Sequence, residues 1–175
     1  MILGHHAIKN GYHDKSIIIE PYSEKMIGPN SYDVILGRNF KRVECNSNSL
    51  FEYYIDPKLP QQYTEYKDMD SVTILPGELW IAHTVEKIGS TKFVPMLEGR
   101  SSIGRMGLFV HVAAGFGDVG FVNQWTLEFA SVKPIRVYSG MRIAQVFFHT
   151  MTDNDVQYSG RYVGQTGAQE SRFAL

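Results

Sequence analysis

The sequence predicts a mainly β fold, either an antiparallel barrel or a jelly-roll-like sandwich. Short stretches rich in β-branched and aromatic residues recur along the chain, and each is bounded by Pro, Gly, Asn or Ser. The chain has 175 residues, of which 43% are hydrophobic and 20% charged. This composition is typical of a folded globular protein, and the length suits a single domain over residues 1–175 with a sizeable core.

The elements follow from the local patterns. Residues 1–11 are predicted to form a short helix that ends near Gly11. The predicted strands lie at residues 17–19, 32–36, 71–75, 79–85, 135–138 and 142–148. Ser139-Gly140 predicts a hairpin turn between the last two of these strands, because Gly tolerates the backbone angles of tight turns.

Two segments depart from the strand pattern. Residues 46–70 are polar and rich in tyrosine, which indicates an excursion from the barrel. Residues 153–175 are polar and contain three glycines. This tail is either a frayed terminus or a flap that becomes ordered over a ligand or a neighbouring subunit.

Charge and composition exclude several classes of function. The net charge is −1, which argues against a nucleic-acid-binding protein with a basic surface, so an anion site would be a local cluster. The chain has no apolar run near the ~20 residues of a membrane span, and its start lacks the pattern of a signal peptide. The single Cys45 excludes an internal disulfide. We therefore expect a cytoplasmic protein without a membrane or nucleic-acid partner.

Residues 98–121 form the most informative stretch. Arginines and serines stand there beside glycines, and guanidinium groups, hydroxyls and accessible backbone N–H groups together suit a polyphosphate. A strand pattern follows at residues 126–130. Alternation along it places Thr126 and Glu128 on one face and Leu127 and Phe129 on the other.

Five separated blocks of the sequence resemble, in order, the motifs of the dCTP deaminase family, which belongs to the dUTPase-like superfamily. These blocks are Met1–Leu3 with Gly28–Gly37, Gly99–Leu108, His111–Glu128, Tyr138–Gln145 and Arg161–Ser171. The resemblance implies a dUTPase-like distorted β-barrel or jelly roll with a few short helices. It also implies a homotrimer with active sites between subunits, and residues 153–175 as a flap over the active site.

The resemblance implies a catalytic role for four residues. Glu128 would be the general base that activates water. Ser101 Oγ and the backbone carbonyl of Ala114 would hold that water, and Arg105 would orient Glu128. The zinc-dependent deaminases instead require an H-x-E…P-C-x-x-C signature, which this chain lacks. We therefore expect no zinc.

The other implied contacts are to the nucleotide. They involve Arg100, Ser102, Ile103, Gly104, Asp118, Phe121, Thr126, Leu127, Gln145, Tyr158, Arg161 and Gln165. The triphosphate would be held by Arg100, Ser102, Arg161 and Gln165, together with the backbone of residues 101–104. Asp118 would bind the deoxyribose 3′-OH, Phe121 would crowd the sugar, and Tyr158 would help to close the tail. Mg²⁺ would bind through the triphosphate, without a protein metal site.

The chain departs from the family pattern at three places. Ala113 stands where the family usually has Thr, which puts inhibition by dTTP in doubt. Val119 replaces a common Pro, which should loosen the turn after Asp118. Residues 122–125 also differ, and they introduce Trp125, which either packs between subunits or shapes the nucleotide pocket.

Several functions remain open from the sequence. The first is hydrolytic deamination of dCTP to dUTP and ammonia. The second is a bifunctional enzyme that also cleaves dUTP to dUMP and pyrophosphate. A dedicated dUTPase and a non-catalytic nucleotide-sensing trimer rank below these, because Glu128, Ser101 and Arg105 are all present. A 5-substituted dCTP is a further possible substrate.

Overall fold

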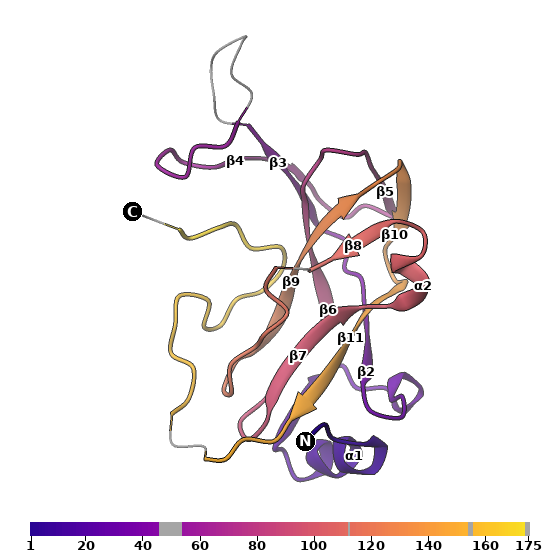
Figure 1. Ribbon diagram of the computed structural model, residues 1–175, viewed down its shortest axis with the longest axis vertical. Helices are drawn as coiled ribbons and strands as arrows, with labels where there is room; N and C mark the ends of the chain where they lie inside the picture. The colour runs from indigo at the N-terminus through magenta and orange to yellow at the C-terminus, as the bar shows by residue number, and fades with distance from the viewer. Residues whose placement is uncertain (46–53, 112, 154–155, 174–175) are drawn as a thin grey trace.

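The computed structural model describes residues 1–45, 54–111, 113–153 and 156–173 (Figure 1). As predicted, the fold is mainly β. The strands are β1 (Ile17–Glu20), β2 (Tyr32–Ile35), β3 (Phe40–Glu44), β4 (Gln62–Tyr66), β5 (Ser71–Ile74), β6 (Trp80–Ser90), β7 (Val94–Gly99), β8 (Leu108–Val110), β9 (Val122–Ser131), β10 (Ile135–Tyr138) and β11 (Arg142–His149). The helices are α1 (His5–His13), the 3₁₀ turn η1 (Glu24–Met26) and α2 (Ser101–Gly104).

The strands form three antiparallel sheets around one apolar core. The largest has the order β4-β3-β6-β9-β8, with β1 also paired to β6; the others are β2-β11-β7 and β10-β5. Strand alternation sets the core. On β2, for example, Tyr32 and Val34 are fully buried while Asp33 and Ile35 are partly exposed. The core thus holds the large sheet against the smaller ones.

The predicted hairpin around Ser139-Gly140 is wrong in its pairing. The turn is present, and the N–H of Met141 donates to the carbonyl of Tyr138 at 3.3 Å. However, β10 pairs with β5, whereas β11 pairs with β2 and β7. The turn therefore carries the chain from one sheet to another, because each of the two strands has other partners.

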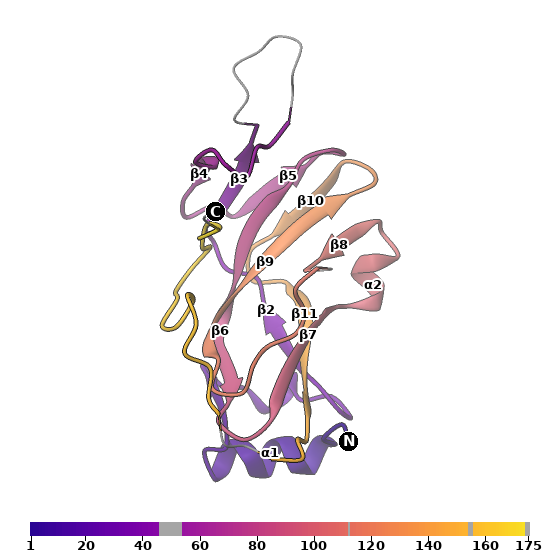
Figure 2. The same cartoon turned by 60° about the vertical axis from the view of Figure 1, so that its left-hand side comes forward.

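The first helix also differs from its prediction. It begins at His5 and continues through Gly11 to His13. Gly11 does not end the helix because it is the position where α1 meets β1: a Cβ added there would lie 2.8 Å from Ile17 Cδ1. Figure 2 shows α1 lying across one end of the sheets.

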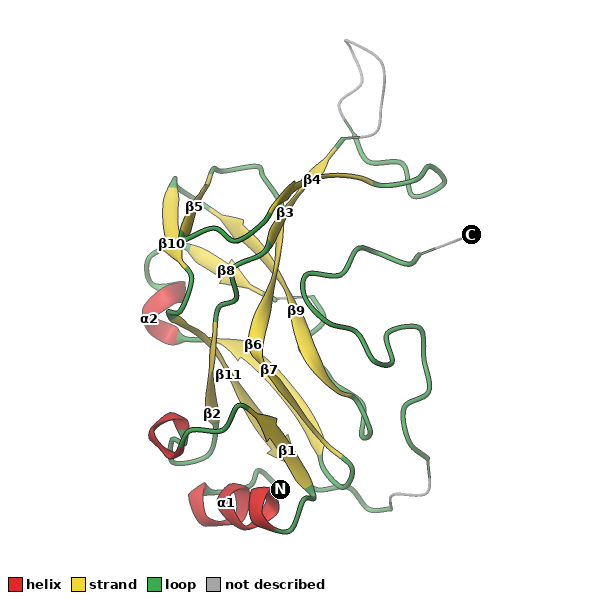
Figure 3. Ribbon diagram, turned by 180° about the vertical axis from the view of Figure 1, so that it is seen from behind, coloured by secondary structure: helices red, strands yellow, loops and turns green. Residues whose placement is uncertain are grey.

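The polar segment at residues 46–70 contains a strand. Residues 46–53 lie outside the described part of the chain, but 62–66 form β4, which pairs with β3. Residues 156–173 have neither helix nor strand and run along the outside of the molecule from the end of β11 (Figure 3). Among the described residues, no helix combines the length and apolar character needed to span a membrane.

Candidate active site

A cavity of about 540 Å³ lies on one face of the large sheet. Its floor includes residues of β3, β6 and β9, represented by Val43, Ile81 and Glu128. The segment that follows β8 and the tail supply further walls. The lining is mainly apolar with a few carboxylates and amides, as is common in small-molecule sites.

The alternation of β9 directs Glu128 into this cavity. Thr126 and Glu128 line it, whereas Leu127 and Phe129 are fully buried in the core. This confirms the two faces predicted for the strand. A carboxylate is therefore presented to the cavity from a rigid central strand.

His111 holds Glu128 through both backbone and side chain. The backbone N–H of His111 donates to the carbonyl of Glu128 at 2.8 Å, and the ring Nδ1 is hydrogen-bonded to Glu128 Oε2. The His111 side chain is only 7% exposed, while that of Glu128 is 37% exposed. His111 has a φ of 54°, an uncommon conformation that directs its ring back to the strand. The sequence analysis assigned His111 no role, because nothing in its local pattern indicates this partner.

Trp125 belongs to the wall of the cavity. It is 3% exposed, and its Nε1 donates to the carbonyl of Ile88 at 2.9 Å. Its ring meets those of Phe121 and His111 edge-on, at centroid distances of 5.3 and 5.9 Å. Phe121 in turn meets Tyr158 of the tail at 5.5 Å. These rings form an aromatic wall beside Glu128, which favours the second of the two sequence interpretations of Trp125.

The predicted site residues separate into two groups. The cavity brings together Ala114, Asp118, Phe121, Thr126, Glu128, Tyr158 and Gln165. The residues that do not line it are Arg100, Ser101, Ser102, Ile103, Gly104, Arg105, Leu127, Gln145 and Arg161. The side chains of Ile103 and Leu127 are buried in the core, so a contact from either would come from its backbone.

Most of the second group, residues 100–105, lies at α2, a single helical turn that begins after Arg100. The others lie elsewhere: Leu127 in β9, Gln145 in β11 and Arg161 in the tail. Ser101 in the α2 turn and Arg105 directly after it are exposed. Arg100 Nε lies 3.4 Å from Asp33, which also binds Arg142 at 3.3 Å. Figure 1 shows α2 on the opposite side of the protomer from the tail. Ser101 and Arg105 therefore do not line the cavity that holds Glu128.

The tail is attached to β9 beside the cavity. Gln165 is 8% exposed, and its side chain donates to the carbonyl of Gln124 at 2.9 Å. The side chain of Gln124 accepts the N–H of Gly167 at 2.7 Å. Arg161 instead donates to the carbonyl of Arg172 at 3.0 Å. The guanidinium group of Arg161 thus contacts another residue of the tail.

The residues present do not make a metal site of their own. Within the described ranges, no three His, Cys, Asp or Glu side chains gather closely enough to hold a metal ion. Two of the carboxylates that line the cavity already have partners, since Glu128 binds His111 and Glu170 binds Lys41.

Comparison with known proteins places the chain in a family. The family model described as dCTP deaminase-like matches residues 2–151. A protein of Clostridium acetobutylicum named "dCTP deaminase, dUMP-forming" is 42% identical over 176 residues, covering 98% of this chain and 95% of the relative. One of the same name from Leptospira biflexa is 44% identical over 157 residues, with coverages of 89% and 86%.

A solved structure shares the fold. The 2′-deoxycytidine 5′-triphosphate deaminase of Agrobacterium tumefaciens superposes with a TM-score of 0.64 at 20% identity, covering 86% of this chain. This chain spans 48% of the length of that one. The match over residues 2–151, together with the near-complete alignment to the Clostridium protein, shows that the chain belongs to the dCTP deaminase-like family.

Proposed function

We propose that this protein deaminates dCTP and then hydrolyses the resulting dUTP, giving dUMP, pyrophosphate and ammonia. Family membership supports action on dCTP, and the names of the two bacterial relatives favour the dUMP-forming reaction over release of dUTP. The sequence analysis had ranked simple deamination first. The observation that carries the proposal is the carboxylate of Glu128, presented to the cavity and oriented by His111.

In the deamination, Glu128 is the general base. It takes a proton from water as the resulting hydroxide adds to C4 of the cytosine ring, and the carboxyl group delivers this proton to N3. It then transfers the proton of the new C4 hydroxyl to the amine, which leaves as ammonia. Loss of ammonia leaves the C4 carbonyl of dUTP. His111 holds Oε2, so we assign Oε1 to the water. Asp118, also in the cavity, accepts a hydrogen bond from the sugar 3′-OH.

In the second reaction, water attacks the α-phosphorus of dUTP and pyrophosphate leaves. Mg²⁺ bound to the phosphate oxygens would supply charge neutralisation for this step. The chain's own part is to hold the nucleotide and to exclude bulk water. The aromatic wall of Phe121, Trp125 and Tyr158 and the attached tail are suited to both tasks.

A second copy of the chain completes the site in this proposal. Ser101 in α2 and Arg105 directly after it are exposed and do not line the cavity that holds Glu128, yet the resemblance assigns all three to one site. Large apolar side chains are exposed near α2 in the sequence, at Met106 and Phe109. Such exposure is typical of an interaction surface, so we propose that α2 of one subunit of a homotrimer meets the cavity of the next.

Product analysis tests the reaction. The purified protein is incubated with Mg²⁺ and dCTP, and nucleotides are separated by anion exchange while ammonia is measured. The proposal expects dUMP and pyrophosphate in step with ammonia. Accumulation of dUTP instead would establish a simple deaminase, and no turnover of dCTP would contradict the proposal. Because Ala113 lacks the hydroxyl usual in the family, we expect added dTTP to inhibit weakly.

Complementation tests the shared site. Glu128→Gln and Ser101→Ala variants, each inactive alone, are co-expressed so that mixed trimers form. If Glu128 and Ser101 of one site come from different subunits, about a quarter of the sites in randomly mixed trimers carry both native residues, and activity returns to that level. If both residues of a site come from one chain, co-expression restores nothing.

A further inference from the structure

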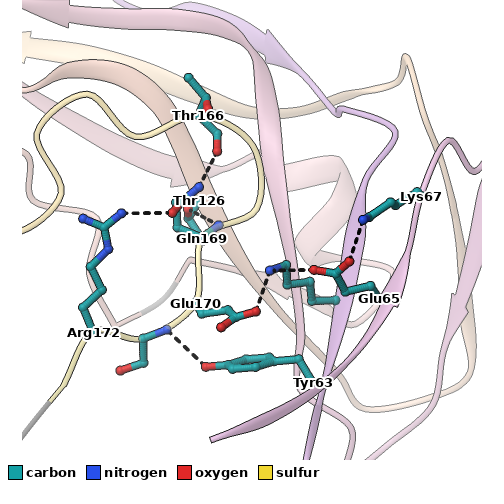
Figure 4. Close-up of polar contacts among 10 residues, drawn as sticks. Tyr63, Glu65, Lys67, Thr126, Thr166, Gln169, Glu170 and Arg172 are labelled. Carbon is teal, nitrogen blue, oxygen red and sulfur yellow. Dashed lines mark hydrogen bonds and ion pairs between the residues drawn. The ribbon is translucent and has the colours of Figure 1, made fainter.

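Three consecutive residues near the end of the tail connect the two sides of the cavity. The N–H of Gln169 donates to Thr126 Oγ1 of β9 at 3.2 Å. Glu170 then binds Lys41 of β3 at 2.6 Å, and the N–H of Ser171 donates to the hydroxyl of Tyr63 of β4 at 3.1 Å. We call residues 169–171 the tail bridge; Figure 4 shows it between Thr126 and Tyr63.

The sheet order shows what the bridge crosses. In the order β4-β3-β6-β9, the strands β6 and β3 lie between Thr126 on β9 and Tyr63 on β4. The cavity lining comes from this same set of strands, and all three bridge residues line the cavity as well. The bridge therefore crosses the cavity. It is attached to β9 at one end and to the paired strands β3 and β4 at the other.

The attachment at β3 and β4 is electrostatic as well as geometric. The Lys41 side chain is 18% exposed and lies between Glu170 and Glu65, which is 3.1 Å away. Burial lowers the pKa of Lys41, but hydrogen bonds to Glu170 and Glu65 outweigh it, and the net pKa is raised. Lys41 is thus cationic at neutral pH. A polyphosphate in the cavity would be repelled by an unpaired Glu170, and Lys41 offsets that charge.

We propose that Lys41 and Tyr63 are positioning residues that fasten the tail bridge across the cavity and so retain the nucleotide. Neither belongs to the motifs that carry the family resemblance. They act by fixing the place of the tail, which affects nucleotide affinity more than the chemical step. The nucleotide in this statement rests on the proposed function, whereas the fastening of the bridge does not.

Hydrogen exchange on the free protein tests the fastening alone. Tyr63→Phe keeps the ring but removes the acceptor for the Ser171 amide, so that amide should exchange about fivefold faster, as expected for loss of a neutral hydrogen bond of about 1 kcal/mol. Tyr66→Phe is the matched control, since it removes a tyrosine hydroxyl from the same strand while its ring packs on Trp80. Unchanged exchange at 169–171 in Tyr63→Phe would overturn the proposal.

Steady-state kinetics test the consequence for the nucleotide. Lys41→Met should raise the Michaelis constant for dCTP about fivefold with kcat within about twofold, because a partly exposed ion pair contributes modestly. Lys67→Met is the control, since Lys67 also binds Glu65, at 2.9 Å, without a contact to the tail bridge. Lys41→Arg should recover most of the loss.

A double variant distinguishes fastening from general damage to β3 and β4. If Lys41 acts through Glu170, adding Glu170→Gln to Lys41→Met should produce little further change. Fully additive effects would contradict the proposal. Should no form of the protein turn over dCTP, the proposed function fails, and the exchange rates of 169–171 in Tyr63→Phe and in Lys41→Met still decide whether Tyr63 and Lys41 hold the tail.

Discussion

Replacement of His111 by Ala should slow deamination strongly without abolishing folding. The ring of His111 is the side-chain partner that the structure gives to Glu128, and it binds Oε2 from a buried position. A hydrogen bond to a charged group contributes about 1.5–3 kcal/mol, and we take the lower half of this range because Glu128 is 37% exposed. The expected result is a fall in kcat of about 10- to 50-fold.

The assay is steady-state ammonia release from saturating dCTP, with thermal unfolding measured alongside. His111→Asn is the informative companion, because Asn tolerates the φ of 54° and carries an N–H₂ donor close to the position of Nδ1. It should retain much more activity than His111→Ala. The reasoning is refuted if a folded His111→Ala enzyme keeps the native kcat, or if Asn and Ala are equally slow.

Two further predictions concern stability. Gly37→Ala would place a Cβ 2.2 Å from the buried ring of His83, so overpacking should lower the free energy of unfolding by about 1–3 kcal/mol, measured by urea denaturation; an unchanged midpoint would show that His83 moves freely. Burial raises the pKa of Glu86 above its ordinary value of 4.5, although its Oε2 accepts the N–H of Ile35 at 2.9 Å. The stabilisation from the protonated form is therefore present below that value and is lost as pH rises through the raised pKa. Glu86→Gln should thus unfold at higher urea than the native protein near neutral pH, and the gain should shrink on acidification; a gain independent of pH would contradict this.

Local patterns predicted the parts of the fold whose signal lies within one segment. The strand at residues 135–138 has the predicted bounds, and the faces of Thr126 and Glu128 follow from alternation alone. β4 was not predicted because its sequence, Gln-Tyr-Thr-Glu-Tyr, is polar on both faces. It is a strand because it pairs with β3, and a local pattern does not show this pairing. The helix was predicted to end near Gly11, but this glycine lies inside α1, where the absence of a Cβ allows close packing on Ile17.

Sequence motifs predicted single residues of the candidate site, but they did not predict contacts between residues that are far apart in the sequence. The contact of His111 with Glu128 depends on the pairing of β8 with β9, which places residues 17 apart in sequence side by side. Lys41 and Glu170 are separated by 129 residues, so no periodicity connects them. Arg105 matches the family motif but is exposed directly after α2 and does not line the cavity. Motifs thus name residues of a site without showing how those residues come together.

Glu128→Gln tests the central claim most directly. The substitution keeps the size of the side chain but removes the base, so the account predicts that ammonia release from dCTP falls by about 10²- to 10⁴-fold while calorimetry shows dCTP and Mg²⁺ binding with nearly native affinity. Turnover close to that of the native enzyme would show that another group activates the water, and the assignment of Glu128 as the general base would be wrong.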